Sequence, residues 1–178
     1  MEIQAEVAEV FNLVSDLRRK ASLNPNIQVI RVELEGEPTI REGSVFYHRI
    51  QRGTRIVEYR SRCIRYVPPR LFQTRGETDP PFEITVTVEP TASGCRLTQR
   101  EELEVTPEML DALEPSETKS GLFREVSRLL RFFPGGRQLE SEIRAHQRER
   151  LKRRLTRELQ AWLDAIKAYI ETQNSGVV

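Results

Sequence analysis

The sequence predicts an α+β fold in which a curved antiparallel sheet of six to seven strands wraps around one long C-terminal helix. Three observations support this prediction. The chain begins with a short amphipathic helical segment, continues with a long stretch in which apolar residues alternate with polar ones, and ends with apolar residues spaced by threes and fours. This order of elements is typical of a sheet folded around a helix. A length of 178 residues fits a single domain with one substantial core.

The N-terminal segment predicts two short helices. Apolar residues recur at helical spacing from Val7 to Leu17, which indicates an amphipathic helix over residues 5–18. A second helical turn is expected at residues 20–23. It must end at Asn24, because Pro25 disfavours helical geometry in the residue before it.

The middle of the chain predicts antiparallel strands joined by tight turns. Ile30, Val32 and Leu34 would share one face of the first of these strands, because side chains alternate along a strand. In the fourth strand, two alternating sets of residues compete for the inner face, and the pattern does not decide between them. One set begins with Leu71 and the other with Phe72. The predicted strands cover residues 27–35, 45–52, 55–67, 71–77, 82–89 and 95–103.

The last predicted strand carries two polar residues, Gln99 and Glu101, on its otherwise apolar face. Buried polar groups cost free energy unless they are hydrogen-bonded. These two side chains therefore need either protein partners or a ligand.

Residues 105–137 form an insert-like region between the last strand and the final helix. A helical turn is expected after Pro107, and a further helix over about 119–133. Pro134-Gly135-Gly136 would break the chain before a final helix over about 137–173. At ~1.5 Å per residue that helix would be on the order of 50 Å long. Its first turns must therefore overhang the sheet or pack on the insert.

Composition excludes several classes of function. Lys and Arg number 28 against 27 for Asp and Glu, so the net charge of +1 does not favour nucleic acid as a partner. The chain has no apolar run of ~18 residues and no N-terminal leader pattern, so a cytoplasmic protein is expected. Two cysteines and two histidines without metal-ligand spacing predict neither a metal site nor a cofactor. Neither a phosphate-binding glycine loop nor a serine nucleophile elbow is present.

Several short segments resemble the START-like (SRPBCC) superfamily, which has the helix-grip fold and includes polyketide cyclases and lipid-transfer domains. They are Ile3-Gln4-Ala5 with Val10-Phe11 and Ser15-Asp16, then Asn24-Pro25, Glu42-Gly43, Tyr66-Val67-Pro68-Pro69, Gly94-Cys95-Arg96-Leu97-Thr98 and the helix from Leu159 to Ile170. The resemblance covers most of the chain outside residues 105–137. It implies a single domain over residues 1–178 with two short helices after the first strand. It also implies that Cys63 and Cys95 lie on strands separated by two others, beyond reach of a disulfide.

The resemblance further implies a ligand cavity between the concave face of the sheet and the long helix. The alternative is a filled core, in which Gln99 and Glu101 reach backbone or arginine partners. The candidate lining residues are Phe46, His48, Tyr59, Ser61, Gln99 and Glu101, and the candidate lid residues in the insert are Leu122, Phe123, Val126 and Leu130.

Three functional hypotheses follow. The first is binding or transport of a hydrophobic small molecule such as a lipid, a polyketide or an isoprenoid-like compound. The second is a cyclase or dehydratase in which Glu101, His48 or Tyr59 acts as acid or base. The third is an interaction module that uses the basic stretch 148–157 of the final helix, with transient membrane-surface contact as one form. That stretch has no interleaved aromatic residues, so no nucleic-acid partner is expected. No oligomeric state is predicted.

Overall fold

The structure is a computed structural model that describes residues 1–106 and 136–175, with side chains in the last helix described over 145–174. The chain divides into two compact units, and each is considered by itself. One unit comprises residues 1–104 and 158–178, and the other comprises residues 105–157. The predicted helical segments after Pro107 and over 119–133 lie outside the described residues. The single domain with an insert at 105–137 thus remains a prediction.

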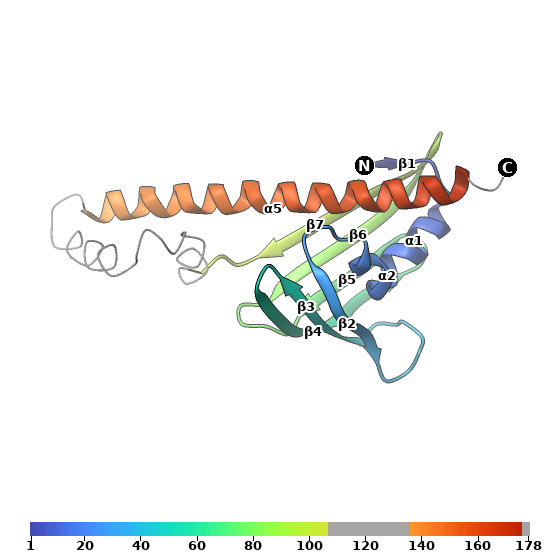
Figure 1. Ribbon diagram of the computed structural model, residues 1–178, viewed down its shortest axis with the longest axis horizontal. Coiled ribbons are helices and arrows are strands. Elements are labelled where there is room, and N and C mark those ends of the chain that lie inside the picture. Colours follow the sequence, from blue (N-terminus) through green and yellow to red (C-terminus); the bar gives the residue numbers. More distant parts are fainter. Residues whose placement is uncertain (107–135, 176–178) are drawn as a thin grey trace. The chain divides into compact units, whose positions relative to one another are not determined.

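The first unit contains one seven-stranded, open and curved antiparallel sheet with the end of a long helix, which confirms the predicted fold class (Figure 1). The strand order is β1-β7-β6-β5-β4-β3-β2. The elements are β1 (Glu2–Ile3), α1 (Val7–Ser15), α2 (Leu17–Ser22), β2 (Gln28–Glu35), β3 (Val45–Arg52), β4 (Arg55–Val67), β5 (Leu71–Gly76), β6 (Phe82–Thr91), β7 (Gly94–Leu103) and α5 (Gly136–Ser175).

The N-terminal helical segment is interrupted at Asp16, so the predicted continuous helix over residues 5–18 is wrong. Asp16 has extended backbone angles, and its side chain accepts a hydrogen bond of 3.1 Å from the backbone N–H of Arg19. An aspartate in this position satisfies an N–H that has no partner within the helix. The interaction starts α2 as a separate helix that runs directly after α1.

The first long strand also departs from simple alternation. A register shift lies between Val29 and Arg31 where β2 pairs with β3. Ile30 is 44% exposed, whereas Val32 is buried, so the prediction that the two share one face is wrong. A β-bulge inserts one residue into the strand and changes the side on which the preceding side chains project.

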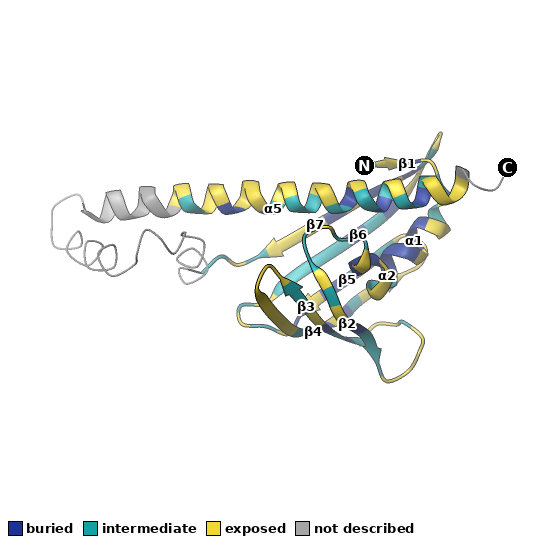
Figure 2. Cartoon of the chain, viewed as in Figure 1, coloured by how far each residue is buried: buried dark blue, intermediate teal, exposed yellow. Residues whose placement is uncertain are grey.

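The core joins α1, α5 and the concave face of the sheet. Phe11 of α1, Phe72 of β5 and Leu97 of β7 are almost completely buried in one cluster with Ile166 and Ile170 of α5. Each such side chain contributes ~1.5–3 kcal/mol by leaving water. Figure 2 shows the buried positions along α1 and along one side of the final turns of α5. The apolar stripe of the last helix therefore packs on the sheet, as its spacing predicts.

The two cysteines are free and buried. Cys63 lies on β4 and Cys95 on β7, with β5 and β6 between them in the sheet. This arrangement confirms the prediction of free thiols.

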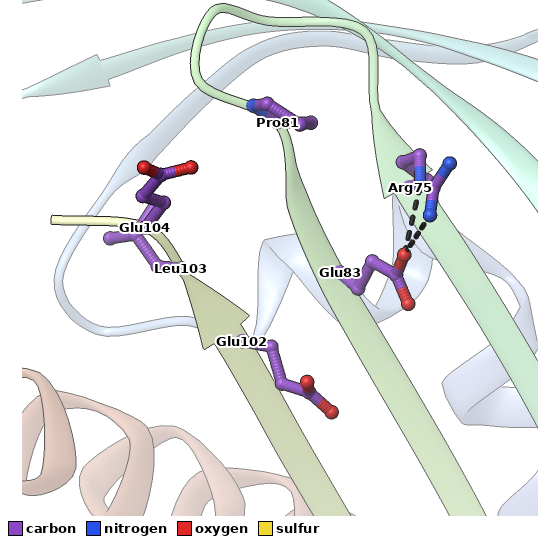
Figure 3. Close-up of a pocket in the computed structure, with 6 residues that line it drawn as sticks. All are labelled: Arg75, Pro81, Glu83, Glu102, Leu103 and Glu104. Carbon is purple, nitrogen blue, oxygen red and sulfur yellow. Dashed lines mark hydrogen bonds and ion pairs between the residues drawn. The ribbon is translucent and has the colours of Figure 1, made fainter.

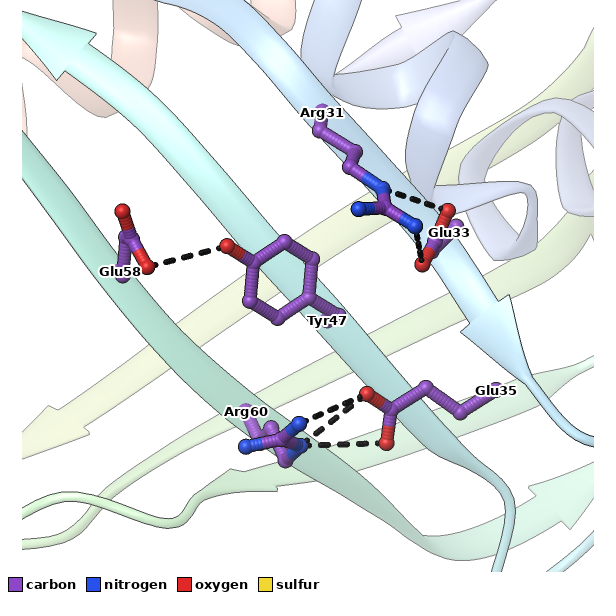
Figure 4. Close-up of polar contacts among 6 residues, drawn as sticks. All are labelled: Arg31, Glu33, Glu35, Tyr47, Glu58 and Arg60. Carbon is purple, nitrogen blue, oxygen red and sulfur yellow. Dashed lines mark hydrogen bonds and ion pairs between the residues drawn. The ribbon is translucent and has the colours of Figure 1, made fainter.

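The convex face of the sheet is a solvated network of charges (Figure 4). The ring of Tyr47 lies between two guanidinium groups, with its centroid 5.5 Å from Cζ of Arg31 and 5.7 Å from Cζ of Arg60. Its hydroxyl donates a 3.0 Å hydrogen bond to Glu58. Arg60 also pairs with Glu35 at 3.0 Å. Exposed pairs of this kind each contribute little to stability, so this face is mainly a source of solubility.

Gly76, at the end of β5, leaves space for an aromatic ring. A Cβ at this position would overlap the ring of Phe82. We therefore expect Gly76→Ala to lower the free energy of unfolding by about 1–3 kcal/mol, because the ring must move from a packed position. Urea denaturation of Gly76→Ala, Phe82→Leu and the double variant would measure this. The alanine should cost less in the Phe82→Leu background, and an equal cost in both backgrounds would contradict the steric explanation.

Candidate ligand-binding site

Strand register places the predicted lining residues on the concave face. His48 pairs with Tyr59, and Phe46 pairs with Ser61, across β3 and β4. Directly paired residues project on the same side of a sheet. Across β6 and β7 the inner apolar residues Val86 and Ile84 pair with Gln99 and Glu101 in the same way. Phe46, His48, Ser61 and Gln99 are buried, Tyr59 is half-buried and Glu101 is exposed.

His48 and Ser61 form a buried polar pair on one side of this face. The His48 Nε2 atom lies 2.9 Å from the Ser61 Oγ atom. Burial lowers the pKa of His48 to about 4, so the imidazole is neutral near pH 7. Its ring stacks on Tyr59 with centroids 4.5 Å apart and planes 6° from parallel. This stacking fixes the orientation of both rings.

Tyr59 presents a protonated phenol. Burial, together with the negative charge of Glu101, raises its pKa to about 12. The edge of the ring packs against Phe82, with centroids 5.5 Å apart and planes 73° from parallel. Near pH 7 the hydroxyl is thus a hydrogen-bond donor and acceptor but a poor base.

Gln99 and Glu101 contact each other. The Gln99 Nε2 atom donates a 2.7 Å hydrogen bond to the Glu101 Oε1 atom. Because a carboxylate can only accept, this bond determines which end of the amide faces Glu101. The Gln99 Oε1 atom therefore points elsewhere, and it is buried without a hydrogen-bond partner among the described residues. Such an acceptor costs ~1–3 kcal/mol when it stays unsatisfied.

Lys20 is a site residue that the sequence interpretation missed. Its side chain extends from α2 and is only 2% exposed. The Nζ atom lies 4.9 Å from the centroid of the Trp162 ring of α5, and the Trp162 Nε1 atom donates a 2.9 Å hydrogen bond to the Lys20 carbonyl. Burial lowers the pKa of Lys20 to about 8, and the charge of Glu101 partly opposes this shift.

A signal for this burial was present in the sequence. Leu17, Lys20 and Ala21 follow the i, i+3, i+4 spacing that places residues on one face of a helix. Ala21 is buried and Leu17 is half-buried against the core. The charged side chain thus shares the inward face of α2 with apolar neighbours.

Together these groups give a largely apolar surface with a few polar groups of defined state. It offers a neutral imidazole, a protonated phenol, an unsatisfied amide oxygen, a carboxylate and an amine that titrates near pH 8. Such a set can orient a mainly apolar molecule that carries hydroxyl or carbonyl groups. No three His, Cys, Asp or Glu side chains converge as a metal site would require within residues 1–106 and 136–175. The predicted lid residues Leu122, Phe123, Val126 and Leu130 lie outside the described residues.

A second concavity differs in chemistry. It is an open depression of about 320 Å³ at the ends of β5, β6 and β7 (Figure 3). Its lining includes Glu83, Glu102 and Glu104, and Arg75 forms an ion pair with Glu83. Arg75, Glu83 and Glu102 belong to the outward-facing set of residues. The depression is therefore charged and solvated, unlike the concave face.

The basic stretch of the final helix is exposed where it is described. Arg148, Arg150 and Lys152 are exposed, and Arg153 pairs with Glu149 at 3.0 Å. None of the helices in the described parts of the chain is both long and apolar enough to cross a membrane.

We expect Lys20→Met to stabilise the protein at neutral pH. The folded pKa of about 8 lies below the usual 10.5, so the folded protein holds this proton less tightly than the unfolded chain does. The resulting destabilisation is fully present below pH 8 and disappears as the pH rises toward 10.5. At ~1.4 kcal/mol per pKa unit it amounts to about 3 kcal/mol at pH 7.

Urea denaturation of both proteins between about pH 6 and pH 10 checks this expectation. Lys20→Met should raise the free energy of unfolding by about 1–3 kcal/mol at pH 7, and the difference should narrow toward pH 10. Lys152→Met is the matched control, because it removes an amine that lies exposed on the final helix. A Lys20→Met effect that is constant with pH would contradict the burial of a charged amine.

Known proteins with the same fold support a common architecture. The di-domain ARO/CYC protein StfQ from the steffimycin biosynthetic pathway has a TM-score of 0.65 at 16% identity, over 99% of this chain and 50% of that one. The Polyketide_cyc-like protein Cgl2372 from Corynebacterium glutamicum has a TM-score of 0.54 at 20% identity, over 99% and 91%. Norcoclaurine synthase from Thalictrum flavum, in complex with dopamine and hydroxybenzaldehyde, has a TM-score of 0.53 at 16% identity, over 97% and 83%.

At these identities the structural likeness shows the fold, and this chain spans half the length of the di-domain protein. No curated protein is significantly similar to the chain in sequence. The family model described as polyketide cyclase / dehydrase and lipid transport matches residues 1–131, which is most of the chain. The chain therefore belongs to the polyketide cyclase/dehydrase and lipid-transport family.

Proposed function

We propose that the protein binds a hydrophobic small molecule that carries a hydrogen-bond donor, and that the ligand lies between the concave face of the sheet and the part of α5 from residue 158 onward. The lining residues are those predicted from the sequence, with Lys20 and Trp162 in addition. Apolar burial would supply most of the affinity and the polar groups would supply orientation. A polyketide or another lipid-like molecule with a hydroxyl group fits this description.

The observation that carries the proposal is the unsatisfied Gln99 Oε1 atom. Nearly all buried polar atoms in folded proteins have a hydrogen-bond partner. The Gln99 oxygen is buried and lacks one within the described residues, and the bond from Gln99 to Glu101 holds it in that orientation. A ligand hydroxyl would complete its hydrogen bonding.

Family membership supports the same class of ligand. One similar structure is a cyclase from a biosynthetic pathway, and another holds dopamine and hydroxybenzaldehyde, two aromatic molecules with hydroxyl groups. These ligands are properties of those proteins. For this chain they indicate that the shared fold can hold small aromatic compounds.

The cyclase or dehydratase hypothesis is less well supported than ligand binding, because two of its three candidate acid or base groups are poorly suited to proton transfer. The pKa of His48 is about 4 and that of Tyr59 about 12, so neither changes its protonation readily near pH 7. Glu101, which accepts the hydrogen bond from Gln99, is the one candidate left of the three. The interaction-module hypothesis predicts binding that weakens steeply with salt, whereas ligand burial in an apolar site should be nearly indifferent to it.

Equilibrium dialysis against 2-naphthol and naphthalene would test the binding proposal. These probes share the same apolar rings, and only 2-naphthol has a hydroxyl group that can donate to Gln99. We expect the wild-type protein to bind 2-naphthol about tenfold more tightly than naphthalene, because a tenfold difference corresponds to ~1.4 kcal/mol and satisfying a buried acceptor is worth ~1–3 kcal/mol. Gln99→Leu should abolish most of this preference.

Gln73→Leu is a matched control. Gln73 lies on the opposite face of the sheet and donates a 3.1 Å hydrogen bond to Glu83, so it resembles Gln99 in its bonding but not in its location. Its replacement should leave the preference unchanged. Absence of saturable binding of either probe would overturn the proposal, and so would a preference for 2-naphthol that survives Gln99→Leu.

A further inference from the structure

The chain uses lysine sparingly, and one lysine is buried in the proposed site. Lysine occurs only at positions 20, 119, 152 and 167 among the 28 Lys and Arg residues. The arginines of the sheet's convex face serve in exposed ion pairs. Of the Lys and Arg side chains that the structure describes, only Lys20 is buried. An arginine could not lose its proton there, whereas a lysine can.

The surroundings of Lys20 hold the amine in place without neutralising it. Among the described residues, its Nζ atom has no hydrogen bond or ion pair, and its close contact is the face of Trp162 at 4.9 Å. Glu101 of β7 is the one charged group in the described chain that acts on its pKa. The titratable His48 and Tyr59 lie on the facing sheet, and the pKa of Tyr59 also responds to Glu101. Lys20 and Tyr59 are therefore both close to the same carboxylate.

We propose that Lys20 is a reactive amine that forms a reversible imine with an aldehyde or ketone group of the ligand. This inference rests on the proposed binding function and narrows the ligand to a carbonyl compound. A buried lysine that is not held by an ion pair is the form in which the amine acts as a nucleophile. The lowered pKa leaves a substantial neutral fraction at about pH 7.5.

The reaction balances with water alone. The neutral Nζ atom attacks the carbonyl carbon, and the carbonyl oxygen takes a proton to give a carbinolamine. Loss of that oxygen as one water molecule gives the C=N bond, and addition of water reverses the sequence. The protonated imine keeps the positive charge of the lysine beside the Trp162 ring and the Glu101 carboxylate, both of which stabilise a cation at this position.

Reductive trapping would test this inference. The probe is 4-(hydroxymethyl)benzaldehyde, which has an apolar ring, an aldehyde for Lys20 and an alcohol group that can donate a hydrogen bond to the Gln99 oxygen. In the presence of cyanoborohydride an imine becomes a stable secondary amine, which peptide mass spectrometry can locate. At about pH 7.5 we expect Lys20 to be modified more than about tenfold faster than Lys152 or Lys167, because burial lowers the pKa of Lys20 to about 8 and leaves a substantial neutral fraction.

The titration of the amine is followed separately with acetic anhydride, and the rate of acetylation at Lys20 should rise with pH and reach half its maximum near pH 8. Lys20→Arg keeps the positive charge and should abolish the adduct, and Lys20→Met is the second variant if arginine does not fit the site. Lys167→Arg is the matched control and should leave modification of Lys20 unchanged. Equal modification of all the lysines, or no adduct at Lys20, would overturn the inference.

Binding of 2-naphthol, which has no carbonyl group, separates this inference from the proposed function. If the wild-type protein binds 2-naphthol but forms no adduct at Lys20, the binding proposal stands and the imine is refuted. If neither 2-naphthol binding nor an adduct is observed, both are refuted.

Discussion

The contact between the final turns of α5 and the concave face of the sheet is the constraint on which the rest of the structure depends. Leu163, Ile166 and Ile170 are buried there with residues from α1 and from strands on both sides of the sheet's centre. Hydrogen bonds also hold the C-terminal half of the helix, from Asn26 to the Glu158 carbonyl and from Lys167 to the Glu2 carbonyl. Because the same face carries the polar groups, packing of the helix also determines where a ligand could lie.

The site combines a stabilising core with groups that oppose stability. Lys20 and the unsatisfied oxygen of Gln99 each carry a desolvation penalty that an apolar residue of similar size would not have. The fold tolerates these penalties because the surrounding apolar cluster is large. Groups that are costly in the free protein but useful to a ligand are characteristic of binding and catalytic sites.

Periodicity predicted most of the fold because each long element keeps one face against the core. The strand phases of β3, β6 and β7, and of β4 as far as Cys63, follow directly from alternation, and these place Gln99 and Glu101 on the inner face. Which face of β5 points inward could not be predicted, because each of its two alternating sets of residues contains one large apolar residue, Leu71 or Phe72. Pairing of Thr74 with Cys63 and Ile84 decides it, and that information is not local. Ile30 was assigned to the wrong face because a bulge leaves no mark in the apolar pattern.

The missed features of the site have a common cause, in that tertiary contacts override the usual behaviour of a residue type. Lys20 is not among the predicted site residues, and burial is unusual for its type because lysine rarely lies fully buried. Its burial depends on Trp162, which is 142 residues away along the chain. The direct bond between Gln99 and Glu101 was likewise not predicted, although residues two apart on one strand face are neighbours.

The short break at Asp16 has a consequence for the direction of the amine. Successive residues of a helix are rotated by about 100° around its axis. In an uninterrupted helix from residue 7, the direction of each later side chain would therefore be fixed relative to the buried Val10 and Val14. The capping carboxylate of Asp16 resets that direction one turn before Lys20. The Asp16 side chain thereby determines the direction in which Lys20 projects, which is toward the buried interior. The angle between α1 and α2 follows from this one residue of the sequence.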